Sequence, residues 1–195
     1  MNIWFTADTH FGHNAAIKHS RRPFSSLEEM NETIIDNWNF LVKNGDIIYH
    51  LGDFGFGRIE EMIKFRARLK GKVHLIYGNH DFRNKINRIA YMFSSADCLR
   101  TINWDKNKII LCHYSMNTWD SSHYDSWHLF GHSHGTWEGT GKSMDVGVDC
   151  FGYAPVNYDI IKNIMINRPH NANFVGNHVR IDTICTVEEQ INEPS

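Results

Sequence analysis

Residues 2–13 read NIWFTADTHFGH, and this short stretch joins an apolar run to side chains that bind metals. The run NIWFTA at residues 2–7, with apolar residues at 3–5, is typical of a buried β-strand. Asp8 and His10 follow directly, where that strand is expected to end. In open α/β sheets, ligands collect beyond the carboxyl ends of the strands. The order of residues therefore predicts a rigid strand whose end carries chemistry.

The same order of an apolar run followed by polar residues recurs along the chain. Five more runs are typical of strands and lie at residues 46–53, 72–79, 108–114, 127–132 and 143–149. Helical patterns separate them, at about 26–41, 59–69, 84–93 and 158–166. The first of these helices would start at a capping box formed by Ser25 or Ser26 with Glu28 or Glu29. Alternating strands and helices predict an α/β domain with helices packed on a largely buried sheet.

The composition describes one globular domain and excludes several classes of partner. The 195 residues can bury a core without disulfides, and a net charge of −2 gives no general attraction for nucleic acid or anionic membranes. No run approaches the ~20 apolar residues of a membrane span. The four cysteines form no CxxC pair, so we expect a cytoplasmic protein with reduced thiols. We expect a single domain over residues 1–195, with a peripheral extension after about residue 170, in which residues 179–187 could add an edge strand.

Polar clusters follow five of the predicted strands. They are DTH at 8–10, GD at 52–53, GNHD at 78–81, His113, and GHSH at 131–134. Each of these is common in turns, but five in order at strand ends predict a metal site. Side chains two apart on a strand point the same way, so the outer residues of DTH, and the two histidines of GHSH, are expected to face that site. The glycines in these clusters would let the backbone turn sharply and approach closely.

The types of ligand restrict the metal. Carboxylate, amide and imidazole groups without thiolate suit Mn, Fe, Zn or Ni better than Ca. The candidates are too many for one tetrahedral ion, and a carboxylate can bridge two cations. Two ions ~3.5–4 Å apart are the usual machinery for displacement at phosphorus. We therefore expect two divalent ions, with Mn as the first choice.

The ordered clusters, from Asp8 to about Phe151, resemble the calcineurin-like metallophosphoesterase superfamily, and GNHD with GHSH is a highly specific combination. The resemblance implies a four-layer α-β-β-α sandwich, in which two packed mixed sheets are flanked by helices. It implies that one ion is held by Asp8, His10, Asp53 and His134, and the second by Asp53, Asn79, His113 and His132. It also implies that His80 lies beside the phosphate without binding metal, and that Asp81 orients His80.

Four residues are candidates for substrate contact. His13 follows the DTH cluster closely and could line the cleft, although a surface or capping role is at least as good an interpretation. The sequence RRPF could grip phosphate oxygens through its two arginines, Arg22 included, or form a solvated turn. The aromatic stretch 114–127 lies between two ligand-bearing strands, where loops often carry recognition. Tyr114 and Trp119 in this stretch could stack on a base or pack into the core.

Together these features predict hydrolysis of a phosphate ester. Two cations would lower the pKa of a bridging water whose hydroxide attacks phosphorus in line, while His80 stabilises the transition state or protonates the leaving oxygen. The chain has little room for a capping domain, which favours an exposed cleft and a small nucleotide-type mono- or diester. The alternatives are a non-catalytic scaffold, which is expected to lose ligands, and a nuclease, which needs a basic track. The natural substrate and the oligomeric state are not fixed by the sequence.

Overall fold

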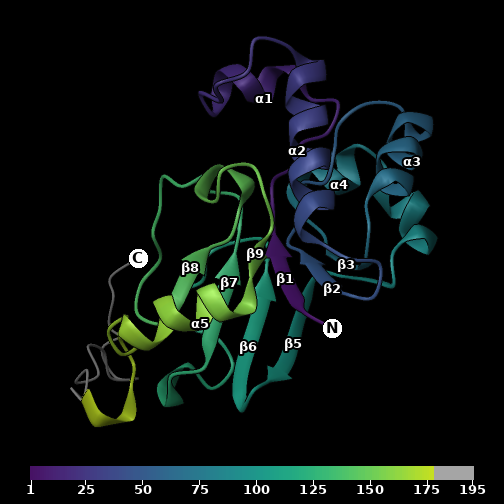
Figure 1. The fold of residues 1–195 in the computed structure, drawn as a ribbon. Coiled ribbons are helices and arrows are strands. Elements are labelled where there is room, and N and C mark those ends of the chain that lie inside the picture. Colours follow the sequence, from purple (N-terminus) through teal and green to yellow (C-terminus); the bar gives the residue numbers. More distant parts are fainter. Residues whose placement is uncertain (178–195) are drawn as a thin grey trace, which may run out of the picture.

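Two β-sheets form the centre of the fold in the computed structural model, which describes residues 1–177 (Figure 1). The first sheet has the order β4-β3-β2-β1-β9, with bounds Ser95–Asp97, Lys72–Ile76, Ile47–His50, Ile3–Thr6 and Val156–Asn157. The second has the order β5-β6-β7-β8, with bounds Leu99–Trp104, Asn107–Cys112, Trp127–Phe130 and Ser143–Asp145. Both sheets are mixed, because β9 and β5 run antiparallel to their neighbours.

The parallel strands bring their carboxyl ends to one end of the molecule. β1 to β4 are parallel within the first sheet, as are β6 to β8 within the second. A backbone bridge between Ala7 and Gly147 joins the ends of β1 and β8, which belong to different sheets. The helix α1, Asn14–His19, lies beyond these ends (Figure 1). The polar clusters therefore meet where the two sheets come together.

Apolar side chains from both sheets form the core between them. Phe5 and Ile76 of the first sheet share one cluster with Leu111 and Leu129 of the second, and all four are 0% exposed. The helix α5, Tyr158–Asn167, adds buried residues to the same cluster. Burying one such side chain contributes about 1.5–3 kcal/mol. This core holds the strands whose ends carry the polar clusters.

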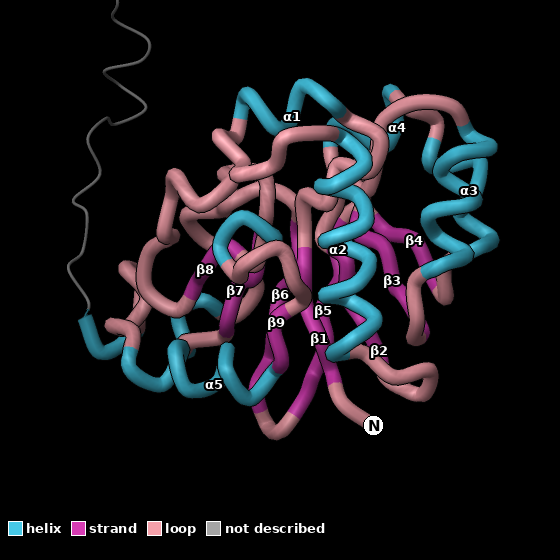
Figure 2. Tube along the Cα trace, turned by 45° about the horizontal axis from the view of Figure 1, so that its top comes forward, coloured by secondary structure: helices cyan, strands magenta, loops and turns pink. Residues whose placement is uncertain are grey.

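Helices cover the outer face of the first sheet. α2, Leu27–Leu41, and α3, Ile59–Arg68, pack there through a second apolar cluster (Figure 2). α2 begins at the predicted capping box, in which Ser26 Oγ accepts the N–H of Glu29 at 3.1 Å. The remaining helical segments in the described part of the chain are α4, Asn79–Arg83, and four 3₁₀ helices at Ile86–Met92, Ser122–Tyr124, Val148–Cys150 and Val175–Asn177.

The segment 114–126 covers the outer face of the second sheet. His128 and Phe130 alternate with inward-facing residues of β7 and so point outward, yet both are 0% exposed. Trp119 packs on His128 with ring centroids 5.2 Å apart. The segment is mostly irregular, so on this face a loop takes the position of the expected helical layer.

The expected α/β sandwich is confirmed, and its six predicted strands are all present. Each ends earlier than predicted, by one to four residues, because the polar cluster that follows it has already left the strand conformation. The sequence did not predict β4, β5 and β9. β5 alternates exposed and half-buried residues, a pattern that could have identified it. β4 and β9 are too short to carry such a signal.

Three of the four predicted helices are confirmed, namely α2, α3 and α5. The helix expected at 84–93 is wrong in type and start, because α4 ends at Arg83 and a 3₁₀ helix follows after Lys85, whose φ is 60°. α1 was not predicted. The proposed edge strand at 179–187 lies outside the described residues.

The last described residues are anchored to the segment 114–126, which covers the second sheet. Asn171 is 2% exposed, and its Nδ2 donates to the carbonyls of Ser122 and Ser126 at 2.8 and 3.1 Å. Within residues 1–177, no helix has both the length and the apolar character that crossing a bilayer demands. The single domain over the whole chain stays a prediction.

Candidate metal centre

Most of the expected ligands lie in left-handed turns beyond the strands. Asp8 and His10 follow the end of β1 with φ values of 58° and 49°. Asp53, His132 and His134 have φ values of 56°, 67° and 48°. The expectation that ligands two apart share one strand is therefore wrong, although they do reach one centre. Left-handed conformations of non-glycine residues cost about 1–3 kcal/mol and persist where surrounding contacts hold them.

Glycines allow the ligand loops to approach closely, as the sequence indicates. A Cβ at Gly78 would lie 2.3 Å from Asp53 Oδ1, and a Cβ at Gly131 would lie 2.6 Å from Asp8 Oδ2. Such distances are too short for any real side chain. A larger residue at either position would displace a carboxylate of the centre.

Two groups of potential ligands lie side by side at the strand ends. They are Asp8, His10 and His134 in the first group, and Asp53, His113 and His132 in the second, with ligand atoms within 4.8 Å of one another in each group. Asp53 Oδ2 lies 3.7 Å from His10 Nε2 and 3.5 Å from His113 Nε2, so it faces both groups. Asn79 Oδ1 is 3.1 Å from His113 Nε2. This grouping has the same division of residues that the family resemblance implies.

The donors of the first group fit a divalent cation. Asp8 Oδ1 is buried without a hydrogen-bond partner among the described residues, which is costly for a carboxylate oxygen. Its other oxygen accepts the N–H of His132 at 2.8 Å. Burial raises the pKa of Asp8 to about 7 and lowers the pKa of His10. A cation here would pair the orphan oxygen and favour the ionised carboxylate and the neutral imidazole.

The second group is centred on the contact between Asp53 and His113. Burial by itself raises the pKa of Asp53, but the hydrogen bond and charge of His113 outweigh it and hold that pKa well below its usual range. Burial by itself lowers the pKa of His113, but Asp53 and Asp8 raise it to about 9. His113 Nδ1 donates to Leu51 O at 2.7 Å, which leaves Nε2 directed at Asp53. A cation at Nε2 would replace the proton that the carboxylates favour.

Asp81 supports Asp53 and does not orient His80. Its carboxylate accepts the N–H groups of Asp53, Phe54 and Gly78 at 2.9, 2.9 and 2.7 Å. Burial raises the pKa of Asp81 to about 6. The role expected for Asp81 is therefore wrong, because main-chain donors occupy both of its oxygens. This contact was not predictable from GNHD alone, since two of the donors come from another loop.

His80 lies beside both groups without belonging to either. Its N–H donates to Asp53 Oδ1 at 2.9 Å, and its Nε2 is 3.9 Å from Asp53 Oδ2. The ring centroid is 5.4 Å from that of His10, and the side chain is 27% exposed. His80 Nδ1 is buried and has no partner among the described residues. The imidazole thus faces the centre through Nε2.

Arg22 is a buried support and not an open phosphate ligand. It is 4% exposed, and its Nε and Nη2 donate to the two oxygens of Asp149, both at 2.8 Å. Its Nη2 and Nη1 also donate to the carbonyls of Asp8 and Thr9 at 2.6 and 3.2 Å. The expected phosphate contact is therefore wrong for Arg22, because these groups occupy the guanidinium.

Asp149 is a functional residue that the sequence reasoning missed. Its Oδ2 accepts a hydrogen bond from His134 Nδ1 at 2.7 Å, which directs His134 Nε2 toward the first group. Burial by itself raises the pKa of Asp149, but hydrogen bonds from His134 and Arg22 outweigh it and lower that pKa. Asp149 closes the run SMDVGVD, so the rule that found the other clusters at strand ends could have found it too.

The remaining substrate candidates divide between the centre and the outer face. His13 stacks on Phe56 with centroids 4.5 Å apart, and its Nδ1 is 3.3 Å from His10 Nδ1. Tyr114 is 46% exposed, with its ring centroid 5.0 Å from that of His132. Both lie at the edge of the centre. Trp119 lies elsewhere.

Trp119 belongs to the layer over the second sheet. Its indole N–H donates to the carbonyl and the hydroxyl of Ser126, both at 3.0 Å. Its ring packs on His128. The expectation that Trp119 stacks on a base is therefore wrong, because the side chain is engaged away from the ligand groups.

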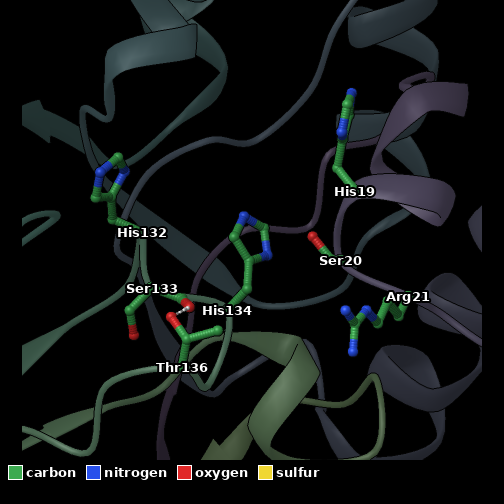
Figure 3. Close-up of a pocket in the computed structure, with 7 residues that line it drawn as sticks. All are labelled: His19, Ser20, Arg21, His132, Ser133, His134 and Thr136. Atoms are coloured by element: carbon green, nitrogen blue, oxygen red, sulfur yellow. Dashed lines mark hydrogen bonds between the residues drawn. The ribbon is translucent and has the colours of Figure 1, made fainter.

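An open cavity of about 770 Å³ adjoins the first and second groups (Figure 3). Its lining residues are His19, Ser20, Arg21, His132, Ser133, His134 and Thr136. Small-molecule sites typically measure about 300–1,000 Å³. The space is therefore large enough for a nucleotide-sized ligand beside the centre.

A model of the calcineurin-like phosphoesterase superfamily domain matches residues 1–142, which include all seven expected ligands. The chain belongs to the calcineurin-like phosphoesterase superfamily. It is accordingly a metal-dependent phosphoesterase, and both candidate ligand groups lie within the matched residues.

Several relatives resemble this phosphoesterase over most or part of its length. An uncharacterized protein of Methanocaldococcus jannaschii is 31% identical over 172 residues, which are 84% of this chain and 90% of the relative. The gene 66 protein of Mycobacterium phage L5 is 32% identical over 98 residues, 49% of this chain and 47% of that protein. A crystal structure of an Aquifex aeolicus protein of unknown function has a TM-score of 0.70 at 22% identity, covering 84% of this chain and 98% of that one. The last comparison shows that the fold is shared.

Proposed function

We propose that this phosphoesterase holds two divalent cations, with Mn²⁺ preferred, and hydrolyses a small nucleotide-type phosphate ester. One ion would be held by Asp8, His10, Asp53 and His134, and the other by Asp53, Asn79, His113 and His132. The observation that carries the proposal is the position of Asp53 Oδ2, 3.7 and 3.5 Å from imidazole nitrogens of the two groups. When bound, the cations lower the pKa of a water molecule for attack at phosphorus and stabilise charge on the phosphoryl oxygens.

The chain itself supplies the acid–base group. His80 Nε2 faces the centre, while its side chain remains partly exposed to the cleft. From this position Nε2 would donate a proton to the leaving oxygen, or a hydrogen bond to a phosphoryl oxygen. The hydrogen bond from the His80 N–H to Asp53 fixes the backbone that carries the imidazole.

The rim of the centre supports a substrate larger than inorganic phosphate. His13 and Tyr114 place two rings beside the ligand groups, where they would contact the organic part of an ester. The adjoining cavity of about 770 Å³ gives room for a nucleoside. A non-catalytic scaffold is disfavoured, because the chain has a metal-binding residue at all seven expected ligand positions and keeps His80.

A nuclease is the second candidate, and one groove favours it. The groove measures about 470 Å³, and its lining includes the basic residues Arg58, Arg83, Lys85 and Arg88. Arg83 ends α4, the short helix that begins with Asn79 and His80. A strand of nucleic acid bound there would make hydrolysis depend steeply on salt, whereas a mononucleotide ester would not.

The first experiment compares substrates after chelation and reloading with metal. Activity should vanish on chelation and return best with Mn²⁺, at two ions per chain by elemental analysis. The panel contains a nitrophenyl phosphomonoester, bis(p-nitrophenyl) phosphate, linear and cyclic nucleotides, and short RNA at two salt concentrations. Full activity with one ion or fewer per chain would contradict the binuclear proposal.

His80→Ala should separate metal binding from catalysis. Both ions should stay bound, and turnover should fall by about 10²–10⁴, the usual contribution of a general acid. The penalty should be larger for a ribose or alkyl leaving group than for nitrophenolate, which departs without a proton. Equal penalties would assign His80 to charge stabilisation, and loss of an ion would overturn the ligand assignment.

A further inference from the structure

The cavity beside the centre has two walls of different origin. One wall carries His132 and His134, the candidate ligands that follow β7. The other wall is the carboxyl end of α1 and the residues after it, including Ser20 and Arg21. Figure 3 shows the Arg21 guanidinium and the Ser20 hydroxyl both directed toward the side of the cavity that carries His134. A ligand between the walls would meet the centre on one side and Arg21 on the other.

The two adjacent arginines of RRPF have opposite environments. Arg22 is buried and bonded to Asp149, which in turn accepts the hydrogen bond from His134. Arg21 is exposed. Because Arg22 links this turn to the hydrogen-bond partner of a candidate ligand, it fixes the position of Arg21 relative to the centre. The backbone of the turn is therefore held in place, while the guanidinium of Arg21 stays exposed.

Arg21 occupies a position where glycine would be more stable. α1 ends in a Schellman turn, in which the N–H of Arg22 donates to Ile17 O at 2.9 Å and that of Arg21 to Lys18 O at 3.4 Å. Arg21 is the left-handed residue of this turn, with a φ of 51°. Glycine adopts this conformation without strain, whereas an L side chain does not. Nothing in the turn itself explains an arginine here.

The charge around Arg21 favours an anion. The arginine ion pairs within residues 1–177 involve Arg22, Arg58, Arg68 and Arg100, and not Arg21. None of the seven residues that line the cavity is acidic. Phosphate oxygens match the planar fork of a guanidinium, and a serine hydroxyl can donate a further hydrogen bond.

We propose that Arg21 and Ser20 form a subsite for a second phosphate group of the substrate. This proposal rests on the proposed function and narrows it to esters that carry two phosphates, one hydrolysed at the metal centre and the other held by Arg21. Arg21 is then a specificity residue that acts on binding. A charge-assisted contact of this kind changes affinity by about 10-fold to 100-fold.

The test uses two nitrophenyl esters that differ only in the second phosphate. They are thymidine 5′-(p-nitrophenyl phosphate) and thymidine 3′-phosphate 5′-(p-nitrophenyl phosphate), assayed with the Mn²⁺-loaded full chain. Wild type should prefer the doubly phosphorylated ester by about 10-fold or more in kcat/KM, through KM. Arg21→Gly should lose this preference while its melting temperature stays equal or rises. Arg21→Lys should keep part of it.

Lys18→Ala is the matched control, since it removes a charge from the last turn of the same helix without lining the cavity. Its preference should stay within about twofold of wild type. A short oligonucleotide is assayed as a third substrate, to distinguish binding of a free second phosphate from binding of a backbone phosphate. The subsite is confirmed for a free phosphate if the thymidine bisphosphate ester is preferred over the oligonucleotide, and overturned if Arg21→Gly keeps the wild-type preference.

Calorimetric binding of thymidine 3′,5′-bisphosphate and thymidine 5′-phosphate separates this proposal from the proposed function. Tighter binding of the bisphosphate by wild type, lost in Arg21→Gly, supports the subsite even if neither ester is hydrolysed. Absence of hydrolysis would then count against the proposed function alone. Equal binding of the two nucleotides by wild type would overturn the subsite.

Discussion

Two of the loops that carry the centre are held by buried charges of opposite sign. The Asp53 loop rests on Asp81, whose carboxylate accepts three main-chain N–H groups. The loop of residues 8–10 rests on Arg22, whose guanidinium donates to two carbonyls of that loop and to Asp149. The first support is a lone carboxylate surrounded by amide dipoles. The second is an ion pair that continues to a candidate ligand.

This difference indicates how loss of each supporting residue would affect metal binding. Asp81 holds the backbone of Asp53, the residue that faces both ligand groups. Arg22 acts through Asp149 on His134, which belongs to the first group only. Loss of Asp81 should therefore affect both ions, and loss of Arg22 one ion.

The two loops are joined by main-chain hydrogen bonds, from the N–H groups of Asp8 and His10 to the carbonyls of Gly52 and Asp53 at 2.9 and 3.0 Å, and by one side-chain contact. Thr9 Oγ1 donates to Phe54 O at 2.7 Å and lies 2.9 Å from His50 Nε2. The Thr9 hydroxyl has one proton, which it donates to Phe54 O. His50 Nε2 must therefore be protonated and donate to Thr9 Oγ1. His50 Nδ1 is then a buried acceptor without a partner among the described residues. Unlike the two charged supports, the link between the loops is neutral.

The largest effect is expected for Asp81→Ala. It leaves three buried N–H groups unpaired, each of which costs about 1–3 kcal/mol, so stability should fall by about 3 kcal/mol or more. Occupancy of both ions should fall with it. Urea unfolding and elemental analysis measure the two effects. Asp81→Asn, which keeps an acceptor oxygen, should be milder, and two retained ions in Asp81→Ala would contradict the role of Asp81.

Arg22→Met should have a more selective effect. Removing one partner of a buried ion pair costs about 3–5 kcal/mol, and losing the support behind a metal-binding histidine typically weakens one ion by about 10–100-fold. The ion of the second group should remain. Metal titration followed by calorimetry would resolve the two sites. Arg22→Lys, which keeps the charge without the planar guanidinium, serves as the control. An equal loss of affinity for both ions would contradict the proposed difference between the Asp81 and Arg22 supports.

The neutral link should make stability sensitive to acid. Burial lowers the pKa of His50 to about 3, so the unfolded chain takes up a proton below about pH 6.5 that the folded chain refuses. The contribution of His50 to the free energy of unfolding is fully present above pH 6.5 and is lost as the pH falls toward 3. At pH 5 the loss is about 2 kcal/mol.

Replacing His50 should remove that part of the pH dependence. His50→Leu is expected to lower stability at pH 7.5 and to flatten the loss between pH 7.5 and pH 5.0. Urea unfolding of the chelated protein at the two pH values measures the difference between the variant and wild type. Identical pH slopes would show that other groups account for the acid sensitivity.

The smallest effect concerns the independence of the two supports. Main-chain hydrogen bonds and the Thr9–Phe54 contact join the two loops, but Asp81 and Arg22 share no hydrogen-bond partner. The stability changes of Asp81→Asn and Arg22→Met should therefore add to within about 0.5 kcal/mol in the double variant. A larger departure, measured by urea unfolding, would mean that the two loops are held as one unit.

The positions of the ligands could be predicted from the sequence because they depend on local order. Short apolar runs define strands, and the clusters DTH, GD, GNHD and GHSH follow those runs directly. Parallel strands in one sheet must end at the same edge, so residues far apart in the chain are brought together. The class of fold, the gathering of the ligands at one edge and the need for glycine at Gly78 and Gly131 follow from this order, whereas the division of the ligands into two groups was implied by the family resemblance.

Only the tertiary structure decided what adjacent residues do. Arg21 and Arg22 are identical side chains in one motif, yet one is open and the other is bonded to Asp149, 127 residues away in the chain. Asp81 follows His80 directly but bonds to the loop of Asp53. A local pattern fixes backbone conformation and which residue types are near an edge. A buried charge must be paired with an opposite charge or a hydrogen-bonding dipole, because an unpaired one is costly. Which group supplies that partner depends on segments that come together only in the folded chain.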